Sequence, residues 1–368
     1  MKVLFLTSSL GAGGAERVAT TLCNAWAERG NQVTLVPTFS GGGKPFYEVS
    51  NNVKLSYLAD LVECTGKTPL LYIKRLLALR SLIARENPDV VISFLPNVNV
   101  AAIASALFLS VHVICCERRD PSSQPTTIFW EFACRMAYRF ADMFVVQTES
   151  VANTVGKMYP HLKCVRTVAN PLPEDVISLQ KEGVEKARKT LLSLGRLSDE
   201  KQVAMILNAF ASVASDHPDW DLRIYGDGPI YGKLESQIHL LGLQHRAFLM
   251  GRTTTPWLVM AKADAFVMAS KYEGFPNALL ESMAIGLPCV AFDCPSGPRE
   301  ISLEGKVALL VPLNDETALA HALQQLMGDA EFRQVLGDKA RASVIERFVL
   351  DKILQQWDAL FIEVGVKP

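Results

Sequence analysis

Residues 1–27 read MKVLFLTSSLGAGGAERVATTLCNAWA, a stretch that joins a short apolar run to a helical pattern through a glycine-rich loop. Residues 3–6 are apolar over the length of a short strand, and residues 15–27 place apolar side chains every three or four positions. Gly13 and Gly14 would let the backbone approach an anion, and free N–H groups at a helix start favour negative charge. The stretch predicts a strand–loop–helix unit of an α/β fold, although glycines serve purely steric needs in many such turns.

The alternation of strand and helix patterns continues along the chain. Further strand-like runs are 33–36, 90–94, 111–115, 143–146 and 165–168 and, after a polar interval at 170–173, 191–194, 222–225, 247–249, 266–268, 290–292 and 308–311. Helical patterns such as 70–84, 203–214 and 317–327 separate them. Repeated strand and helix indicate a parallel sheet covered on both faces. With 368 residues and about 150 residues per domain, we expect two doubly wound domains, residues 1–172 and 173–348.

Composition and charge exclude several classes of protein. The 37 basic and 38 acidic side chains leave a net charge of −1, whereas a dedicated nucleic-acid-binding protein carries a basic excess. The eight cysteines include no CxxC pair and no Cys/His spacing suited to zinc. The apolar run at residues 3–6 is too short for a signal peptide. We therefore expect a cytoplasmic protein.

Residues 100–116 contain no Asp, Glu, Lys or Arg and are the one stretch that resembles a membrane span. The stretch holds Ser105, Ser110 and His112, however, and its second half turns β-branched. We interpret it as a buried helix followed by a buried strand.

The loop that opens the second domain carries two cations. Arg196 and Lys201 lie between the strand at 191–194 and the following helix. A planar guanidinium and a mobile ammonium on one loop can neutralise a diphosphate, although charged loops are often merely solvated. Other strand ends carry glycine turns at Gly226-Asp227-Gly228 and Gly251, and such convergence is typical of a nucleotide pocket.

Residues 273–281, EGFPNALLE, place two glutamates around a helix start. Pro276 and Asn277 begin the helix, so its first N–H groups are available to a phosphate. Glu281 lies about one turn, ~5.4 Å, into this helix, and Glu273 stays on the preceding loop. We expect Glu273 to accept sugar hydroxyls and Glu281 ribose hydroxyls. An ordinary surface helix is the alternative, but the flanking apolar residues indicate burial, and a buried glutamate needs a partner.

The spacing of Glu273 and Glu281 resembles the EX7E motif of retaining glycosyltransferase family 4, whose GT-B fold has two Rossmann-like domains facing across a cleft. The glycine and basic segments described above fall in the order and at the spacing of that family's signatures. The resemblance covers nearly the whole chain and implies a nucleotide-sugar donor, with UDP as the nucleotide, bound mainly by the second domain. It also implies that the last helix, residues 349–368, crosses back to the first, acceptor-binding domain.

The resemblance further implies roles for individual residues. The donor contacts are Gly13, Gly14, Arg196, Lys201, Gly226, Gly251, Glu273, Gly274, Phe275, Pro276, Asn277 and Glu281. The catalytic residues are Glu273, Arg196, Lys201 and Arg118. Family members need no cofactor and no metal, and a donor phosphate oxygen is thought to accept the proton of the attacking hydroxyl. Asp219-Trp220-Asp221 mimics a metal-binding DxD motif, but we interpret it as a turn cap.

Arg118 departs from the family pattern. Many relatives carry a histidine at this place, in contact with the donor sugar, whereas this chain reads Glu117-Arg118-Arg119-Asp120-Pro121. An arginine cannot serve as a base near neutral pH, so its role would be electrostatic. Contact of Arg118 or Glu117 with phosphate or sugar and a structural ion pair are equally compatible with the sequence.

The helical pattern at 70–84 carries Lys74, Arg75 and Arg80 among apolar residues. Such a helix can lie on anionic lipid or hold a lipid diphosphate, although a helix with one core face and one solvated face is more frequent. The resemblance favours the lipid interpretation, and residues 127–132 add aromatic side chains that would serve either the interface or the core.

Together these features predict a metal-independent, retaining glycosyltransferase that moves a hexose, such as GalNAc or GlcNAc, from UDP to a polyprenyl-diphosphate-linked saccharide. It would act in O-antigen, capsule or glycan precursor assembly, peripherally at the anionic cytoplasmic membrane surface. A soluble acceptor and a non-catalytic nucleotide-sugar-binding protein remain as alternatives. A dinucleotide-dependent dehydrogenase is disfavoured because Glu16 replaces the third glycine of the GxGxxG fingerprint.

Overall fold

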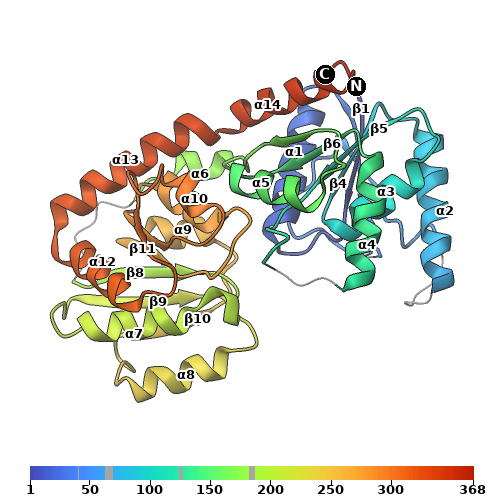
Figure 1. The fold of residues 1–368 in the computed structure, drawn as a ribbon. Coiled ribbons are helices and arrows are strands. Elements are labelled where there is room, and N and C mark those ends of the chain that lie inside the picture. Colours follow the sequence, from blue (N-terminus) through green and yellow to red (C-terminus); the bar gives the residue numbers. More distant parts are fainter. Residues whose placement is uncertain (40, 63–68, 124–126, 182–186) are drawn as a thin grey trace. The chain divides into compact units, whose positions relative to one another are not determined.

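The computed structural model describes residues 1–39, 41–62, 69–123, 127–181 and 187–368. The chain divides into two compact units, one made of residues 1–171 and 351–368 and the other of residues 172–350. Each unit has a parallel sheet with helices packed against it (Figure 1). The expected α/β, doubly wound fold class is therefore confirmed.

The first unit is built on a seven-stranded sheet in the order β3-β2-β1-β4-β5-β6-β7, with every neighbouring pair parallel. Its strands are β1 (Lys2–Thr7), β2 (Gln32–Pro37), β3 (Val53–Leu55), β4 (Val90–Phe94), β5 (His112–Cys116), β6 (Met143–Val146) and β7 (Val165–Thr167). Its helices are α1 (Gly14–Glu28), α2 (Pro69–Glu86), α3 (Pro96–Ala106), α4 (Ile128–Ala137), the 3-10 helix η1 (Tyr138–Phe140), α5 (Glu149–Met158) and α14 (Leu350–Glu363). The strand order reverses between β1 and β4, and ligands of such folds bind beyond the carboxyl ends of the strands at this point.

Alternate residues of β1 face two different layers of helices. Leu4 packs in a core with residues of α2, α3 and α5. Phe5 points the other way and contacts Trp26 of α1, with ring centroids 6.2 Å apart. Trp26 also contacts Trp357 and Phe361 of α14, each at 5.5 Å. Because both faces are covered, all five residues of β4 are buried, which explains why the strands appear in the sequence as continuous apolar runs.

Residues 100–116 form the end of α3 and the whole of β5, joined by a turn. The interpretation of this stretch as a buried helix followed by a buried strand is confirmed. Within the described ranges, no helix combines the length and the apolar character needed to cross a bilayer.

The second unit has a six-stranded parallel sheet in the order β10-β9-β8-β11-β12-β13. Its strands are β8 (Lys189–Leu194), β9 (Trp220–Tyr225), β10 (Ala247–Gly251), β11 (Ala265–Met268), β12 (Cys289–Phe292) and β13 (Leu309–Val311). Its helices are α6 (Glu174–Ser178), the 3-10 helix η2 (Asp199–Lys201), α7 (Val203–Val213), α8 (Tyr231–Leu240), α9 (Pro256–Ala261), α10 (Asn277–Ile285), α11 (Pro298–Ile301), α12 (Glu316–Gly328) and α13 (Ala330–Phe348). Here the strand order reverses between β8 and β11.

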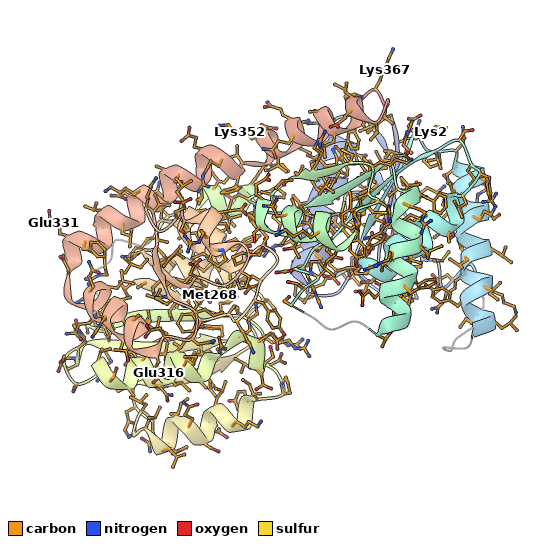
Figure 2. All side chains as sticks on the ribbon, viewed as in Figure 1. Lys2, Met268, Glu316, Glu331, Lys352 and Lys367 are labelled. Atoms are coloured by element: carbon orange, nitrogen blue, oxygen red, sulfur yellow. The ribbon has the colours of Figure 1, made fainter. Side chains whose placement is uncertain are left out.

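The core of the second unit also has two sides. Strand residues such as Leu191 and Val267 pack with α7, α8 and α12, while α10 contacts β11 and β12 and is itself covered by α13. Met268 at the end of β11 lies inside this unit, whereas Glu331 projects outward from α13 (Figure 2). The strand ends are thus fixed by a core on each face of the sheet.

One strand was not expected from the sequence. This is β3, a three-residue edge strand that pairs only with β2 among the described strands. The expected last helix is present as α14, which is separated from α13 by Val349 with φ −57° and ψ 146°. Residues 351–368 then belong to the first unit.

Candidate active site in the second unit

Three loops at the carboxyl edge of the second sheet are tied to one another through the backbone. The N–H of Gly195, after β8, donates to the Tyr225 carbonyl at 3.0 Å, and the N–H of Leu197 donates to the Asp227 carbonyl at 2.8 Å. The N–H of Gly226 donates to the Gly251 carbonyl at 2.8 Å. The predicted convergence of glycine loops is therefore present, and it brings the segments containing Gly195, Gly226 and Gly251 side by side.

Gly226 and Gly228 permit this close approach. A Cβ atom on Gly226 would overlap the carbonyl oxygen of Gly195, and one on Gly228 would overlap the carbonyl oxygen of Leu197. Gly226 also has φ +144°, a conformation that other residues rarely adopt. The two glycines are therefore required by the packing of one loop on another.

Lys201 and Glu273 form an ion pair at this edge of the sheet. The Lys201 Nζ lies 2.5 Å from Glu273 Oε1, and the side chains are 29% and 12% exposed. A backbone hydrogen bond of 2.8 Å from the Lys271 N–H to the Glu200 carbonyl joins the same two loops. Arg196 lies exposed on the loop after β8. The structure thus joins the predicted diphosphate-binding lysine to the predicted sugar-binding carboxylate.

Glu281 lies in α10 with only 3% of its surface exposed. Its Oε2 accepts a hydrogen bond of 2.8 Å from the indole N–H of Trp257 in α9. The expectation that a buried glutamate has a partner is therefore confirmed, but the sequence analysis does not identify Trp257. The only signal in the sequence is the expected burial of Glu281, which implies a hydrogen-bond donor but does not identify the residue that provides it.

The segment before α10 is held from two directions. The Ser296 hydroxyl donates to the Gly274 carbonyl at 2.9 Å, and Gly297 packs so closely on Pro276 that a Cβ atom there would overlap the proline ring. Phe275 is buried against Phe348, with ring centroids 5.7 Å apart. The Phe275 side chain therefore serves the core, and only its backbone N–H fits the predicted donor contact. Asn277 begins α10, and the N-cap residue Pro276 provides no side-chain cap.

The glycine loop of the first unit carries an acidic side chain. Gly13 is the N-cap of α1 and Gly14 its first residue. Glu16 accepts a hydrogen bond of 3.0 Å from the Ser9 hydroxyl, and its carboxylate lies where a Cβ atom of Gly13 would be. An anion bound at Gly13 and Gly14 would therefore have to displace Glu16.

Arg118 and Glu117 are buried after β5, at 7% and 4% exposure. The Arg118 guanidinium donates to Asn170 Oδ1 and lies over the Phe94 ring, with 4.2 Å from Cζ to the ring centroid. The Glu117 carboxylate accepts a 3.0 Å hydrogen bond from the Arg118 backbone N–H. Burial raises the pKa of Glu117 to about 7 and lowers the pKa of Arg118 to about 10. Among the described residues no carboxylate lies within ion-pair distance of Arg118, although the Glu117 carboxylate acts on it electrostatically.

Three of the four basic residues of α2 were predicted to contact lipid or acceptor, and their surroundings differ. Arg80 donates to the carbonyls of Ser105 at 3.1 Å and Leu107 at 2.6 Å, where α3 ends. Arg75 is partly buried, with its Cζ 5.7 Å from the Phe39 ring centroid. Lys74 is exposed. The structure thus gives Arg80 a role in capping α3 and leaves Lys74 on the surface.

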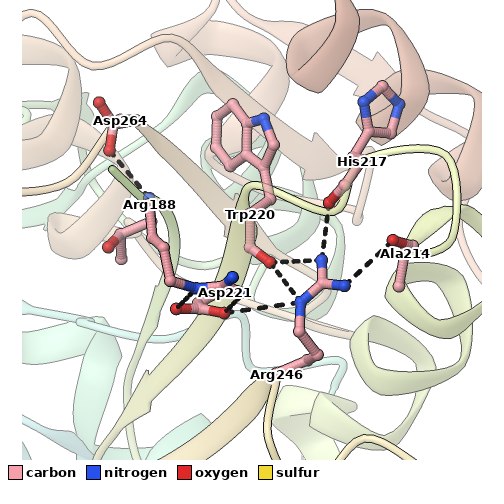
Figure 3. A network of polar contacts seen from close by, with 8 residues as sticks. Arg188, Ala214, His217, Trp220, Asp221, Arg246 and Asp264 are labelled. Atoms are coloured by element: carbon pink, nitrogen blue, oxygen red, sulfur yellow. Dashed lines mark hydrogen bonds and ion pairs between the residues drawn. The ribbon is translucent and has the colours of Figure 1, made fainter. Parts of the chain in front are cut away.

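Asp219 and Asp221 lie at the opposite edge of the second sheet from the glycine loops. Figure 3 shows Asp221 between Arg188 and Arg246, whose nitrogens approach it to 2.5 and 3.6 Å. Asp219 pairs with Lys189 at 2.5 Å. Asp219 lies in the turn before β9, as expected, whereas Asp221 already belongs to the strand, and both carboxylates form ion pairs. In the ranges that the structure describes, no cluster of His, Cys, Asp and Glu side chains suits a metal ion.

The two parallel-sheet units match the domains of solved structures with the GT-B fold. The chain belongs to glycosyltransferase family 4, with residues 12–175 matching the family described as Glycosyltransferase Family 4 and residues 177–343 matching Glycosyl transferases group 1. The expected family and enzyme class are therefore confirmed.

The chain is also similar to individual proteins and solved structures. A Campylobacter jejuni α-1,4-N-acetyl-D-galactosaminyltransferase, named for an undecaprenyl-diphosphate-linked substrate, is 29% identical over 99% of both chains. An exopolysaccharide phosphotransferase of Streptomyces coelicolor is 30% identical, but the chain spans only 41% of its length. The structure of Anabaena HepE in complex with UDP has a TM-score of 0.81 at 18% identity and covers 99% of this chain and 100% of HepE.

Proposed function

We propose that this enzyme transfers a hexose, with retention of configuration and without a metal, from a UDP-sugar to a polyprenyl-diphosphate-linked saccharide in bacterial polysaccharide or glycan assembly. The Lys201–Glu273 ion pair carries the proposal, because it sets a cation for a phosphate beside a carboxylate for a sugar. The Campylobacter relative acts, by its name, on an undecaprenyl-diphosphate-linked saccharide, and HepE has been solved with UDP. The transferred sugar would be GalNAc, GlcNAc or another hexose.

In this proposal the leaving UDP is stabilised by fixed charges and dipoles. Arg196 and Lys201 neutralise the diphosphate, and backbone N–H groups at the start of α10 bind a phosphate oxygen. Glu273 accepts a sugar hydroxyl and orients the anomeric carbon. A donor phosphate oxygen takes the proton of the attacking hydroxyl, the new glycosidic bond forms on the same face, and UDP leaves. Gly13 and Gly14 join the donor site only when Glu16 turns away.

The direct test is transfer by the purified chain from radiolabelled UDP-GalNAc, UDP-GlcNAc and UDP-glucose to a polyprenyl-diphosphate-linked saccharide, with EDTA present. Transfer of one sugar in EDTA supports the proposal. UDP binding without transfer or donor hydrolysis would instead indicate a non-catalytic nucleotide-sugar-binding protein. A strict requirement for magnesium or manganese would contradict metal independence.

Glu281 provides a test of the nucleotide site alone. Replacing Glu281 with glutamine keeps an oxygen that can accept the Trp257 N–H but removes the charge offered to the ribose hydroxyls. We expect UDP binding to weaken by about 1.5–3 kcal/mol, the contribution of a charged hydrogen bond. Isothermal titration calorimetry with UDP and with 2′,3′-dideoxy-UDP checks this, because the second ligand should lose little. An equal loss for both ligands would argue against contact with the ribose.

The first unit would hold the lipid-linked acceptor at an anionic membrane surface, on the cytoplasmic face. Lys74 is exposed on α2 beside three apolar side chains that are also exposed, Leu70, Ile73 and Leu77, at 64%, 54% and 61%. These residues recur at helical spacing, so α2 presents an apolar stripe with a cation next to it. Such a surface suits the boundary between lipid head groups and acyl chains.

Vesicle flotation tests the membrane contact. We expect Lys74→Glu to reduce binding to vesicles of phosphatidylglycerol and phosphatidylcholine by at least about fivefold, because each basic side chain near an anionic surface contributes about 1 kcal/mol. Lys352→Glu on α14 makes the same charge change at another exposed position and should bind like the wild type. Equal loss in both variants would indicate a general charge effect, and no loss would favour a soluble acceptor.

A further inference from the structure

A buried cation lies at the carboxyl edge of the first sheet, beside the point where the strand order reverses. Arg118 follows β5, and its guanidinium lies over the ring of Phe94, the last residue of β4. β4 pairs with β1 on one side and β5 on the other, and the reversal lies between β1 and β4. This is where doubly wound domains bind their ligands. The residue after Phe94, Leu95, has φ +82°, a strained conformation for a bulky side chain.

The groups in direct contact with the Arg118 guanidinium are neutral. One Arg118 Nη donates to the amide oxygen of Asn170, the guanidinium faces an aromatic ring, and the Nε–H is buried without a hydrogen-bond partner. The Glu117 carboxylate acts electrostatically on Arg118, but no carboxylate lies within ion-pair distance of the guanidinium in the described parts of the chain. A pKa of about 10 leaves the guanidinium charged at neutral pH. Buried charges are ordinarily paired, so this one has capacity for an anion.

The Asn170 side chain contacts the guanidinium, and the Gln147 side chain holds Asn170 in place. Asn170 Oδ1 accepts from Arg118 and also, at 3.0 Å, from Gln147 Nε2. Gln147 follows β6, Asn170 follows β7, and both are buried, at 4% and 2% exposure. Residues at three adjacent strand ends therefore meet at this arginine, and its Nε–H has no hydrogen-bond partner among the described residues. A preoriented guanidinium with a free N–H suits the planar, two-oxygen edge of a phosphoryl group.

We propose that Arg118 binds a phosphoryl group of a diphosphate substrate in the first unit, and that Asn170 and Gln147 are positioning residues for its guanidinium. The proposal deepens the proposed function and rests on it for the nature of the substrate. The diphosphate belongs either to the UDP-sugar or to the polyprenyl-linked acceptor. The chemistry is the same in both cases, so the experiment separates the two sources by ligand.

The test uses calorimetry on the full chain with four probes: UDP, uridine, farnesyl diphosphate and inorganic pyrophosphate. We expect Arg118→Gln to weaken at least one diphosphate probe tenfold or more and to leave uridine binding unchanged. Arg118→Lys keeps the charge but lacks the planar set of N–H donors, so it should weaken diphosphate binding less than Arg118→Gln. Arg119→Gln removes an adjacent, exposed charge and serves as the matched control. A loss confined to UDP assigns the site to the donor, and a loss confined to farnesyl diphosphate assigns it to the acceptor.

Asn170→Asp gives a second variant that keeps the shape of the residue. The new carboxylate would form an ion pair with Arg118 and neutralise its charge. Diphosphate binding should then fall about as far as in Arg118→Gln while thermal stability is retained. A purely structural arginine predicts the opposite, a gain in stability from the new ion pair with unchanged binding, and that result overturns the proposal. If the wild type binds pyrophosphate but no UDP, the proposed function fails while the phosphoryl site stands.

Discussion

Replacing Glu273 with glutamine is expected to lower the rate of sugar transfer by roughly 100-fold or more while UDP binding is kept or strengthened. The carboxylate pairs with Lys201 at 2.5 Å and so neutralises part of the ammonium charge. In the proposed function it also accepts a sugar hydroxyl. The glutamine keeps the shape but removes the charge. Transfer should fall because the sugar loses a charged acceptor, and Lys201 should then attract the diphosphate more strongly.

The prediction can be tested clearly because the rate of transfer should fall while the affinity for UDP does not. The measurements are kcat with the preferred UDP-sugar and the Kd of UDP by calorimetry. Lys201→Met should weaken UDP binding and transfer together, because it removes the cation itself. Glu331→Gln, an exposed change on α13, should alter neither quantity. A loss of UDP affinity in Glu273→Gln as large as the loss of transfer would contradict the assignment of Glu273 to the sugar.

The strands were the most predictable part of the fold. Runs such as 90–94 and 143–146 are apolar at every position but Ser93 and become β4 and β6 with the same bounds, because both faces of a covered parallel sheet are buried. β3 shows the limit of this signal. Val53–Leu55 has a charged residue at its centre and is a strand only because it pairs with β2. Its existence depends on a neighbour, not on its own pattern.

The same distinction separates the predictable and unpredictable parts of the site. Spacing along one helix places Glu281 and indicates its burial, but its partner Trp257 comes from a different helix, α9. Lys201 and Glu273 are 72 residues apart, so their ion pair follows from the order of β8 and β11 in the sheet. The partners of Arg80 could not be predicted from its own helix for a similar reason, since the carbonyls to which it donates lie at the end of α3. Sequence patterns identify residue types, and the topology selects their partners.

The topology also explains why a single methyl group at Gly226 should be so damaging. Gly226→Ala would place its Cβ on the carbonyl oxygen of Gly195, at a residue with φ +144°. The obstacle is backbone, which cannot rotate away like a side chain, so the loops after β8 and β9 must separate. The hydrogen bond from the Gly226 N–H to Gly251 would be lost with them. We expect the variant to lose at least about 2 kcal/mol of stability and tenfold or more in UDP affinity, because Arg196 and Lys201 lie on the displaced loop.

Gly232→Ala supplies the matched control for this change. Gly232 lies in α8 with open space where a Cβ atom would be, so alanine should leave UDP binding unchanged and stabilise the helix by up to about 1 kcal/mol. Urea unfolding followed by fluorescence and calorimetry with UDP compare the two variants under one set of conditions. If Gly226→Ala bound UDP as tightly as Gly232→Ala, the close contact between the β8 and β9 loops could not be what shapes the nucleotide site. A loss of affinity in Gly226→Ala alone would tie the geometry of the site to the one position where two backbones leave no room for a side chain.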